Sequence, residues 1–526
     1  MRRWRLPSWW PLAGLTLLAA LLRFSTLDLQ SLWYDEAFTP VHVLHASLGA
    51  TLRAVVHSEN TPPLWYVFEW GVSRVLGTGA VALRLLSALV GVATVPVAWA
   101  IGRELSGAER GSLGPPAAIA AAAFVAVNPL FVWYSQEARA YGLLVFTSAL
   151  AILCFLRVER APVQSSGMGA FDPSLRRRLI AFAASSSLAL LTHYFAVFLV
   201  APMAVWLLRD RARRRAALPA VGVVAAVCAA LTPLVLAQGG HGAQWIERWA
   251  LSSRLQAIPQ YYLTGNSGAP LGHGIELLVA LPILAGLGLG LWRVLEPFEE
   301  RGALIALALS VCGVLAPILL VVFGADYLAP RNLVAAMIPV TAVIAVVVTA
   351  RRAGRSGQLL AAVIAFAFLA ISIDVDVSPR LQRGNWRGVA RALGDRAASV
   401  RVGPAASSGR VTVSAGRVIT TVELGASPLE YYLPGLRNLP RGSSVAVSEI
   451  DETGYAPLRP SAGRPPVPGF RLLDRSDVDG LIVYRFVSSV PREVSEAALR
   501  RAVITRAHPE VLVPPDSQIP SRDKRI

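Results

Sequence analysis

The sequence predicts an α-helical polytopic membrane protein with about eleven transmembrane helices, followed by a small α/β domain outside the membrane. Hydrophobic residues make up 54% of the chain and charged residues only 16%, which is too apolar for a water-soluble protein. Apolar runs of about 20 residues, the length that crosses roughly 30 Å of hydrocarbon, recur up to about Asp374. Beyond that residue the apolar stretches are short and broken by Gly, Pro, Ser and charge, which is typical of a soluble domain.

The candidate spans are the eleven runs at 9–26, 80–101, 115–133, 138–156, 179–191, 194–208, 216–237, 274–293, 302–323, 332–350 and 358–374. Two of them, 179–191 and 194–208, are short for a span. Joining these two would move the arginine cluster at 209–215 to the other side of the membrane. We therefore expect a short hairpin with His193 at its outer tip. We expect the aromatic-rich stretch 62–76 to form a helix that lies on the outer surface.

The arginines predict how the chain is oriented. With the N-terminus inside, every cytoplasmic segment is basic, and these segments are 103–110, 157–178, 209–215, 293–301 and 351–355. Positive side chains collect on the cytoplasmic side because moving them across the membrane is disfavoured. An odd number of spans places the two ends of the chain on opposite sides. We therefore predict a multi-pass protein of the cytoplasmic membrane, with its N-terminus inside and its C-terminal domain outside.

Charge and cysteine usage argue against other classes of protein. The formal net charge is +17, but the basic residues punctuate the apolar runs and do not form one soluble basic surface. We therefore expect membrane lipids and no nucleic acid as partners. The three cysteines all fall inside apolar runs, so the sequence offers no disulfide framework and no zinc site.

The first outer loop, 27–79, carries two pairs of polar residues. Asp35 and Glu36 follow the first helix, and the aromatic residues around them favour the membrane interface. A lipid-linked substrate would present its headgroup at this level. A solvated loop or a helix cap explains two adjacent carboxylates equally simply. His57 and Glu59 follow later in the same loop.

Further polar and aromatic residues lie at the outer ends of other helices. They are Tyr134, Arg139 and Tyr141 at a helix junction, His193 and Tyr194 at the hairpin tip, and Tyr327 and Arg331 before the tenth run. A lone arginine at a membrane boundary usually reaches toward lipid phosphates. It can instead hold a substrate phosphate, because a guanidinium makes two parallel hydrogen bonds to phosphate oxygens. The gathering of these residues on one side, together with the acidic pair, favours a substrate site.

Taken in order, these motifs resemble the GT-C superfamily of integral-membrane glycosyltransferases, in the branch of the protein O-mannosyltransferases, the lipid A aminoarabinose transferases and Rgt-like bacterial enzymes. The likeness covers about residues 9–350 and rests on Asp35 with Glu36 and on the segments 62–66, 82–89, 134–141, 192–195 and 330–333. The segment 385–390 resembles the start of the soluble tail in many bacterial members. The chain departs from the family pattern at Thr61, where a histidine is usual, and at Asn332, where an aromatic residue is common.

The resemblance implies an inverting transfer, in which an acceptor hydroxyl attacks the anomeric carbon of a sugar and a polyprenyl phosphate leaves. Asp35 is then the expected base, and Glu36 would orient the acceptor or Asp35. Arg139 and Arg331 would bind the departing phosphate. The other expected substrate-binding residues are His57, Glu59, Tyr134, Tyr141, His193, Tyr194 and Tyr327. The acceptor would be a protein, a lipid or a cell-envelope glycan.

The same resemblance implies that no cofactor is required, because arginines can balance the charge of a monophosphate leaving group. Asp35, Glu36, His57 and Glu59 could nevertheless hold one divalent cation. We expect no other metal site.

We expect three parts along the chain. A transmembrane glycosyltransferase domain occupies 1–374, an extracytoplasmic α/β domain occupies 375–490, and 491–526 form a disordered tail. A polytopic transporter or a flippase for lipid-linked glycans is the alternative function, since many helices with basic inner loops fit that class. It predicts ionisable residues in mid-span and an internal repeat, whereas the sequence has no clear repeat and its charged residues cluster at the outer ends.

Overall fold

The computed structural model describes residues 9–107, 115–162, 173–241, 244–265, 280–281, 283–284, 286–288, 295–394, 412–414, 416–501, 503–505 and 508–514. The chain divides into two compact units. One unit, which we call the membrane unit, consists of Met1–Asp28 and Leu44–Leu381. The other, the C-terminal unit, consists of Leu29–Val43 and Gln382–Ile526. The segment that carries Asp35 and Glu36 therefore belongs to the C-terminal unit, although it follows the first helix in sequence.

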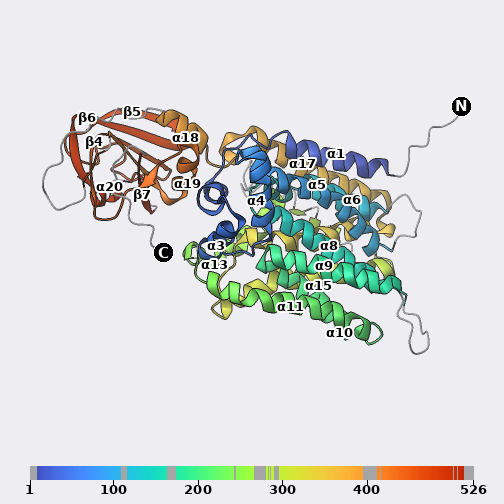
Figure 1. Ribbon diagram of the computed structural model, residues 1–526. Coiled ribbons are helices and arrows are strands. Elements are labelled where there is room, and N and C mark those ends of the chain that lie inside the picture. The colour runs from blue at the N-terminus through green and yellow to red at the C-terminus, as the bar shows by residue number, and fades with distance from the viewer. Residues whose placement is uncertain are drawn as a thin grey trace. The chain divides into compact units, whose positions relative to one another are not determined.

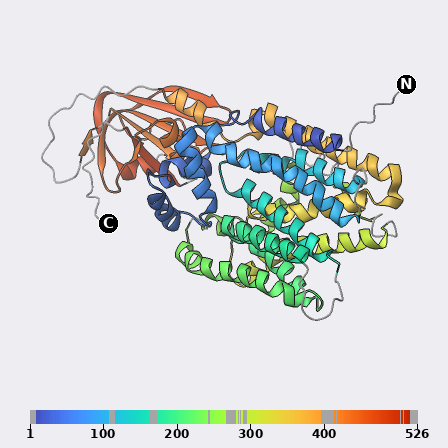
Figure 2. The same cartoon turned by 45° about the vertical axis from the view of Figure 1, so that its right-hand side comes forward.

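The membrane unit is a bundle of long helices that run side by side (Figures 1 and 2). Its described helices are α1 (Trp10–Phe24), α3 (Leu48–Ser58), α4 (Leu64–Leu76), α5 (Ala80–Leu105), α6 (Pro116–Val127), α7 (Pro129–Ser135), α8 (Tyr141–Glu159), α9 (Pro173–Thr192), η2 (Tyr194–Ala196), α10 (Val197–Arg209), α11 (Arg214–Gln238), α12 (Gln244–Arg248), α13 (Leu251–Thr264), α15 (Pro297–Val322), η4 (Pro330–Ala336), α16 (Met337–Val348), η5 (Arg351–Ala353), α17 (Gly354–Val377) and η6 (Pro379–Leu381).

Six segments of the described chain are helices long and apolar enough to cross a membrane, namely α5, α8, α11, α15, η4 with α16, and η5 with α17. The pair α6 and α7, bent by 54°, makes a seventh if it counts as one span. The prediction of a multi-pass helical membrane protein is confirmed, and the predicted count of eleven spans is not. The first run and the run at 194–208 form apolar helices of fewer than 18 residues, and the run at 274–293 lies mostly outside the described residues.

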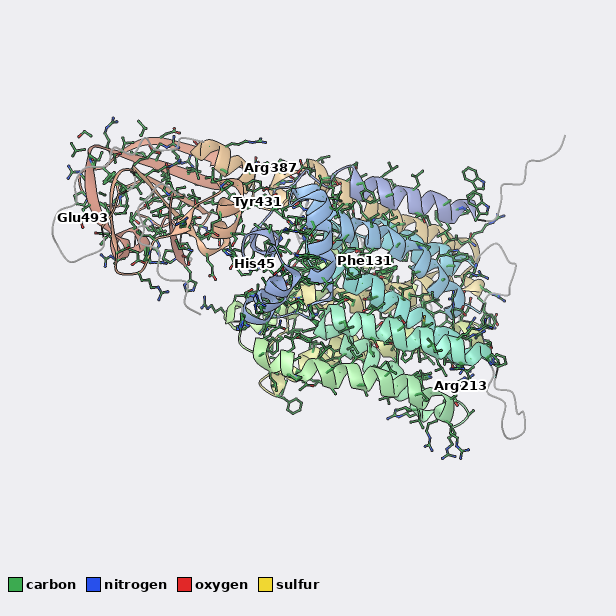
Figure 3. All side chains as sticks on the ribbon, in the orientation of Figure 1. His45, Phe131, Arg213, Arg387, Tyr431 and Glu493 are labelled. Carbon is green, nitrogen blue, oxygen red and sulfur yellow. The ribbon has the colours of Figure 1, made fainter. Side chains whose placement is uncertain are left out.

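The outward faces of these helices carry large apolar side chains. Leu218 and Val223 on α11, Leu315 and Leu319 on α15 and Phe366 on α17 are exposed. Exposing apolar side chains to water costs free energy, whereas exposing them to lipid does not. This pattern therefore fits helices that face hydrocarbon. Figure 3 shows Arg213, which lies just before α11, and His45, which precedes α3, toward opposite ends of the bundle.

The bend between α6 and α7 has a local cause and a distant compensation. Pro129 opens α7 and has no N–H, so α6 cannot continue its hydrogen bonding through this residue. The guanidinium of Arg23 on α1 donates to the carbonyl oxygens of Ala126 at 2.8 Å and Val125 at 3.1 Å. Unpaired carbonyls are costly inside a membrane protein. Arg23 therefore stabilises a broken helix that brings α7 and the following turn into the interior.

Close contact between helices depends on small residues. A side chain at Gly302 of α15 would place its Cβ 2.0 Å from the carbonyl oxygen of Leu105, at the end of α5. Glycine is therefore required where these two helices touch, because backbone atoms of α5 cannot move away as a flexible side chain could.

The C-terminal unit is a mixed β-sheet with helices. Its described elements are α2 (Tyr34–Phe38), the π-helical turn η1 (Thr39–Val43), α18 (Trp386–Leu393), β1 (Thr412–Ser414), β2 (Arg417–Val422), α19 (Glu423–Tyr432), β3 (Arg437–Asn438), β4 (Ser444–Tyr455), β5 (Arg471–Val478), β6 (Leu481–Ser495), α20 (Glu496–Arg501) and β7 (Pro509–Val513). The strand order is β3-β7-β2-β4-β6-β5, and β1 also pairs with β4. The pairs of β4 with β1 and β2 are parallel and the other pairs are antiparallel.

Several sequence features explain this sheet. Asp479 and Gly480 join β5 to β6, and both have positive φ, at 52° and 89°. This is the backbone that a two-residue hairpin of type I′ needs, and Asp-Gly is a favoured pair for it. Helix α18 buries Trp386, Val389 and Leu393 in a core with strands β2 and β6.

The end of the chain differs from the expectation of a disordered tail at 491–526. Strand β6 continues to Ser495, and α20 follows it. Strand β7 then pairs antiparallel with β2, with Thr420 opposite Val511. Val511, Leu512 and Val513 are fully buried. The prediction missed β7 because it rested on the high proline and charge content of the whole region. Composition is averaged over a longer window than this short apolar strand occupies. Residues 515–526 lie outside the described residues.

Candidate active site

The strongest ion pair among the predicted site residues lies in the membrane unit. Glu59, which caps the end of α3, accepts two hydrogen bonds from Arg139, which lies in the turn between α7 and α8. The distances are 3.1 Å from Nη1 to Oε1 and 2.8 Å from Nη2 to Oε2. The side chains are 4% and 13% exposed. A bidentate pair with so little exposure holds its geometry firmly. The sequence named both residues but did not pair them.

Tyr66 of α4 packs beside this pair. Its hydroxyl lies 3.3 Å from the hydroxyl of Thr61, and its ring is fully buried. Burial raises the pKa of Tyr66 well above its usual value, and the positive charge of Arg139 opposes this rise. Tyr66 is therefore a neutral hydrogen-bond donor beside Glu59. The sequence did not single out Tyr66 as a site residue, although it lies in the motif at 62–66.

Gln238, the last residue of α11, holds the loop that carries Glu59. Its amide nitrogen donates to the carbonyl oxygens of Val55 at 2.9 Å and Thr61 at 3.1 Å. Its amide oxygen accepts a hydrogen bond of 2.7 Å from the hydroxyl of Tyr194. Tyr194, a predicted substrate-binding residue, therefore orients Gln238. Gln238 was not predicted as a site residue. Its signal in the sequence was an amide side chain directly after the apolar run 216–237.

Three rings line the same region. The ring centroids of Tyr134 and Tyr141 are 4.9 Å apart, and those of Tyr141 and His193 are 6.0 Å apart. His193 lies between α9 and η2, where its Nδ1 accepts a hydrogen bond from the N–H of Phe195 at 3.2 Å. Burial first, and then the positive charges of Arg139 and Arg331, lower the pKa of His193 to about 3. His193 is therefore neutral at physiological pH, and its Nε2 can donate a hydrogen bond.

Arg331 reaches the region from η4. Its guanidinium lies over the ring of Trp245, 4.8 Å from the centroid. The preceding loop is fixed by Arg254 of α13, which binds both carboxylate oxygens of Asp326 at 2.6 and 2.7 Å. The Arg254 guanidinium holds the pKa of Asp326 below its usual range. Arg254 is a second residue that the sequence reasoning missed, since its partner lies far along the chain.

We call this set the polar cluster. It consists of Glu59, Tyr66, Tyr134, Arg139, Tyr141, His193 and Arg331. Three predicted residues of the membrane unit are not members of it: Tyr194, which binds Gln238, and also His57 and Tyr327. The side chain of His57 is exposed in the last turn of α3, and Tyr327 is 42% exposed. Their roles in substrate binding stay predictions.

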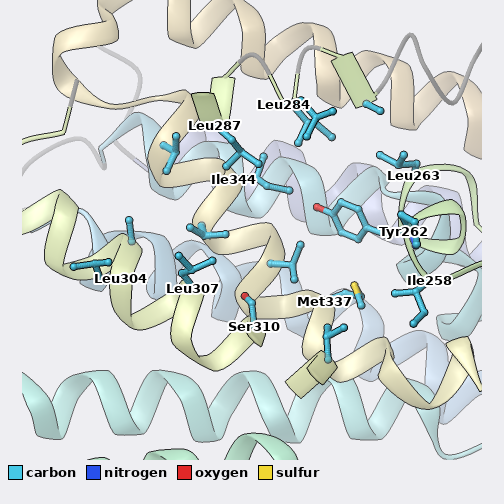
Figure 4. A pocket seen from close by; sticks show the side chains of 18 of the residues that line it. Ile258, Tyr262, Leu263, Leu284, Leu287, Leu304, Leu307, Ser310, Met337 and Ile344 are labelled. Carbon is cyan, nitrogen blue, oxygen red and sulfur yellow. The ribbon is translucent and has the colours of Figure 1, made fainter. Parts of the chain in front are cut away.

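An apolar cavity of about 820 Å³ lies in the membrane unit, between α13, α15, α16 and the described residues at 280–287 (Figure 4). Tyr262, Leu263, Leu304, Leu307, Met337 and Ile344 are among its lining residues. Burial raises the pKa of Tyr261, the neighbour of Tyr262, and the positive charge of the nearby Arg331 opposes this rise. Met337 directly follows η4, the element that carries Arg331. Polar and apolar regions thus share α13 and the junction of η4 with α16.

The acidic pair lies in the C-terminal unit, on the short helix α2. Glu36 is fully buried, and its Oε2 lies 3.7 Å from Nε of Arg383. Asp35 is partly exposed. Because the pair belongs to one unit and Arg139 and Arg331 belong to the other, a shared pocket stays a prediction.

The predicted possibility of a divalent cation also stays a prediction. Within the part of the chain that the structure describes, no three His, Cys, Asp or Glu side chains are grouped so that they could hold a metal ion.

Comparison with known proteins places this fold in a class of membrane glycosyltransferases. The transferase ArnT from Cupriavidus metallidurans, in its apo state, superposes with a TM-score of 0.50 at 14% identity, over 90% of this chain and 97% of that chain. At this identity the likeness shows the fold. The particular family whose sequence model matches, over residues 60–237, is that of the dolichyl-phosphate-mannose-protein mannosyltransferases. The predicted resemblance to GT-C glycosyltransferases that use lipid-linked sugars is confirmed.

Other solved structures are more distant. The oligosaccharyltransferase AglB from Archaeoglobus fulgidus, in complex with an inhibitory peptide and a dolichol-phosphate, gives a TM-score of 0.47 at 13% identity, over 81% of this chain and 63% of that chain. The protein O-mannosyltransferase complex Pmt1-Pmt2 of S. cerevisiae, bound to the sugar donor, gives 0.34 at 18% identity, over 44% of this chain. The chain spans about a third, 33%, of the length of that yeast protein. No match to a curated protein sequence was found.

Proposed function

We propose that the chain transfers a sugar from a polyprenyl-phosphate donor to an acceptor hydroxyl at the outer face of the cytoplasmic membrane. One observation carries the proposal: the membrane unit holds both a polar cluster with two arginines and an apolar cavity, and Arg331 lies near Tyr261, whose neighbour Tyr262 lines that cavity. A polyprenyl phosphate has the same division, since a dianionic headgroup continues into a long hydrocarbon chain. Arginine suits the headgroup, and a cavity lined by leucine, isoleucine and methionine suits isoprene units.

In this proposal Arg139 and Arg331 bind the phosphate. Arg139 already holds Glu59, so a phosphate would share or replace that carboxylate as its partner. The face of the Arg331 guanidinium lies over the ring of Trp245, which holds this side chain in place. Tyr66, Tyr134, Tyr141 and neutral His193 would donate hydrogen bonds, and Glu59 would select among the hydroxyls of the sugar.

Asp35 is the proposed base. The acceptor oxygen forms a bond to the anomeric carbon while the proton of the hydroxyl passes to the Asp35 carboxylate. The bond from the anomeric carbon to the phosphate oxygen breaks, and its electron pair leaves with the polyprenyl phosphate. Attack from the face opposite to the leaving group inverts the anomeric centre. The positive charge of the arginines supports the departure of the phosphate, so these steps need no metal ion.

The orientation belongs to the proposal as well. Basic segments such as 209–215 would face the cytoplasm, with the N-terminus inside. The polar cluster and the C-terminal unit would then face the outside, where the acceptor is a protein, a lipid or a glycan of the cell envelope.

The test is a transfer assay with Asp35→Asn. Purified protein is incubated with a panel of polyprenyl-phosphate sugars and extracted envelope acceptors, and the product is followed by mass. We expect Asp35→Asn to lower the turnover by at least about 10²-fold, the usual contribution of a base, while donor binding is unchanged. Asp210→Asn is the matched control, since Asp210 pairs with Arg213 at a predicted cytoplasmic loop. Unchanged turnover in Asp35→Asn would eliminate Asp35 as the base.

A further inference from the structure

The acidic motif, Asp35 with Glu36, is held by one segment of the C-terminal unit. This segment is 383–387, which lies before the sheet in sequence. From this arrangement we infer that Arg383 is a positioning residue, which fixes Glu36 and through Glu36 sets the direction of Asp35. The inference rests on the proposed function of Asp35 as a base. It gives the C-terminal unit a part in the reaction.

The contact between Glu36 and Arg383 is buried on both sides. Glu36 has no exposed side-chain surface, and the side chain of Arg383 is 3% exposed. Two opposite charges at 3.7 Å attract strongly when so little water is present. Removing one partner of such a pair leaves a charge that is costly to bury. Glu36 is therefore held by Arg383 and shielded from a bulky acceptor, which favours the second of its two expected roles, orienting Asp35, over orienting the acceptor.

The residues before α2 are bound to the same segment. The side-chain oxygen of Gln30 accepts hydrogen bonds from the backbone N–H of Arg383 at 3.0 Å and from its guanidinium at 3.3 Å. The hydroxyl of Ser31 donates to the carbonyl oxygen of Gly384 at 2.8 Å, and Arg387 donates to the carbonyl oxygen of Gln30 at 3.4 Å. Arg387 is labelled in Figure 3. Four hydrogen bonds thus tie Gln30 and Ser31 to three residues of the segment 383–387, which is far away in sequence.

Other contacts hold the far side of the motif. The backbone N–H of Leu32 donates to the hydroxyl of Tyr432 at 2.8 Å. His42, at the end of the segment, lies 3.0 Å from the carboxylate of Glu430. Both partners belong to α19, so α2 is held between α19 and the segment 383–387.

The segment 383–387 is itself anchored to the sheet by two other residues, Asn385 and Trp386. Asn385 caps α18 by accepting a hydrogen bond from the N–H of Gly388 at 2.9 Å, and it donates to Asp479 in the hairpin at 2.8 Å. Trp386 is buried in the core against α19 and the sheet. A Cβ at Gly388 would lie 2.6 Å from Val478, so α18 sits directly on β5. The motif that resembles the start of the soluble tail is thus the link between the acidic motif and a rigid sheet.

The geometry of a helix then explains how Arg383 acts on Asp35. Successive residues of an α-helix point about 100° apart, since 3.6 residues make one turn. When Glu36 points inward to Arg383, its neighbour Asp35 must point along the surface, and Asp35 is partly exposed. A catalytic group needs this kind of fixed support, because a displacement of about 1 Å can cost about 10²-fold in rate.

The first test compares Arg383→Met with Arg417→Met in the full chain. Arg417 forms a buried ion pair with Asp451 in the same unit and has no recorded contact with the acidic motif, so it serves as a matched control. We expect Arg383→Met to lower kcat by about 10²-fold, with KM for the donor changed by less than about twofold, because donor binding belongs to the membrane unit. Arg417→Met should leave kcat within about threefold of the wild type. Equal losses in the two variants would overturn the inference.

A second variant separates positioning from simple loss of a charge. In Glu36→Gln/Arg383→Met neither partner is charged, so no lone charge remains buried. We expect this double variant to be about as impaired as Arg383→Met alone, because the contact that positions Asp35 is absent from both. Recovery of activity would mean that the unpaired charge of Glu36 caused the loss, and it would overturn the inference. Independent losses that multiply would mean that the two residues do not act on one another, and the inference would fail. If Arg383→Met does not fold, Arg383→Lys replaces it, with an expected loss in kcat of about tenfold because lysine lacks the planar fork.

Hydrogen exchange provides a readout that does not depend on activity. In Arg383→Met the amides of Leu29–Val43 should exchange at least about tenfold faster, while those of β4 and β6 keep their protection. In Arg417→Met the order should reverse. If the wild-type protein transfers none of the sugars tested, the proposed function fails, and the exchange pattern alone then decides whether Arg383 holds the segment. Unchanged exchange of Leu29–Val43 in Arg383→Met would overturn the inference in either case.

Discussion

Each of the two units buries a glutamate of a predicted motif against an arginine from a distant part of the same unit, but the two pairs differ in geometry. In the membrane unit, Arg139 binds both oxygens of Glu59 at 2.8 and 3.1 Å. In the C-terminal unit, one nitrogen of Arg383 lies 3.7 Å from Glu36, and Gln30 takes up other donors of Arg383. The first pair is a closed, bidentate contact, and the second is one part of a larger network. Under the proposed function, this difference gives neighbouring acidic residues of one motif separate tasks, with Glu36 as the support and Asp35 as the proposed base.

The two units are alike in another respect, since each buries a carboxyl group for which the described chain shows no salt bridge. Glu69 of α4 is fully buried, and in the described chain neither of its oxygens has a hydrogen-bond partner. Burial raises the pKa of Glu69 well above its usual value. Glu452 of β4 is 2% exposed, and burial raises its pKa to about 8. Both groups are therefore mainly protonated at neutral pH, which avoids the cost of a buried negative charge.

The largest effect on stability is expected when the bidentate pair is broken. Arg139→Met should destabilise the membrane unit by about 3–5 kcal/mol, because the charge of Glu59 remains buried without its partner. Thermal unfolding in detergent measures this loss. Glu59→Gln/Arg139→Met should recover much of it, and Arg352→Met, which breaks the exposed pair with Glu296, should cost no more than about 1 kcal/mol. A smaller loss for Arg139→Met than for Arg383→Met would contradict the contrast between the two pairs.

The next effect is a dependence of the stability of the C-terminal unit on pH, which comes from Glu452. The folded state holds a proton on Glu452 up to about pH 8, whereas the unfolded chain releases it near the ordinary pKa of 4.5. Since the folded state binds more protons in this window, the free energy of unfolding should fall by about 1.4 kcal/mol per pH unit between these values. Hydrogen exchange of β4 and β6 from pH 5 to 8, corrected for intrinsic rates, measures the slope. Glu452→Gln should remove that contribution; an identical slope in the variant would show that Glu452 ionises normally.

The smallest effect is expected from helix packing in the membrane unit. Gly302→Ala places a methyl group 2.0 Å from the Leu105 carbonyl oxygen and should cost about 1–3 kcal/mol, because α15 must move away from α5. Gly222→Ala in α11 is the matched control, since nothing lies within 4 Å of its added Cβ. The control should be neutral or stabilising by up to about 1 kcal/mol, as alanine favours helix. Equal melting temperatures for the two variants would show that this helix contact is not tight.

Local patterns in the sequence were sufficient for much of the fold. The apolar runs predicted helices because a span depends on about 20 consecutive residues. The Asp-Gly pair between β5 and β6 is a local signal of the same kind, because a turn depends on two residues. The motif around Arg139 also predicted a polar region of the membrane unit. In contrast, the strand β7 was missed because five apolar residues stand within a proline-rich and charged segment.

The sequence by itself therefore determined the class of this protein, a multi-pass membrane chain with a soluble C-terminal domain and glycosyltransferase motifs. Only the tertiary structure decided which residues meet: Glu59 with Arg139, Gln238 with Tyr194, and Glu36 with Arg383. It also decided that Leu29–Val43 belongs to the C-terminal unit and not to the helices that flank it. The physical reason is that hydropathy and turn formation act between near neighbours in the chain. Ion pairs and core contacts join distant segments, whose proximity exists only after the chain has folded.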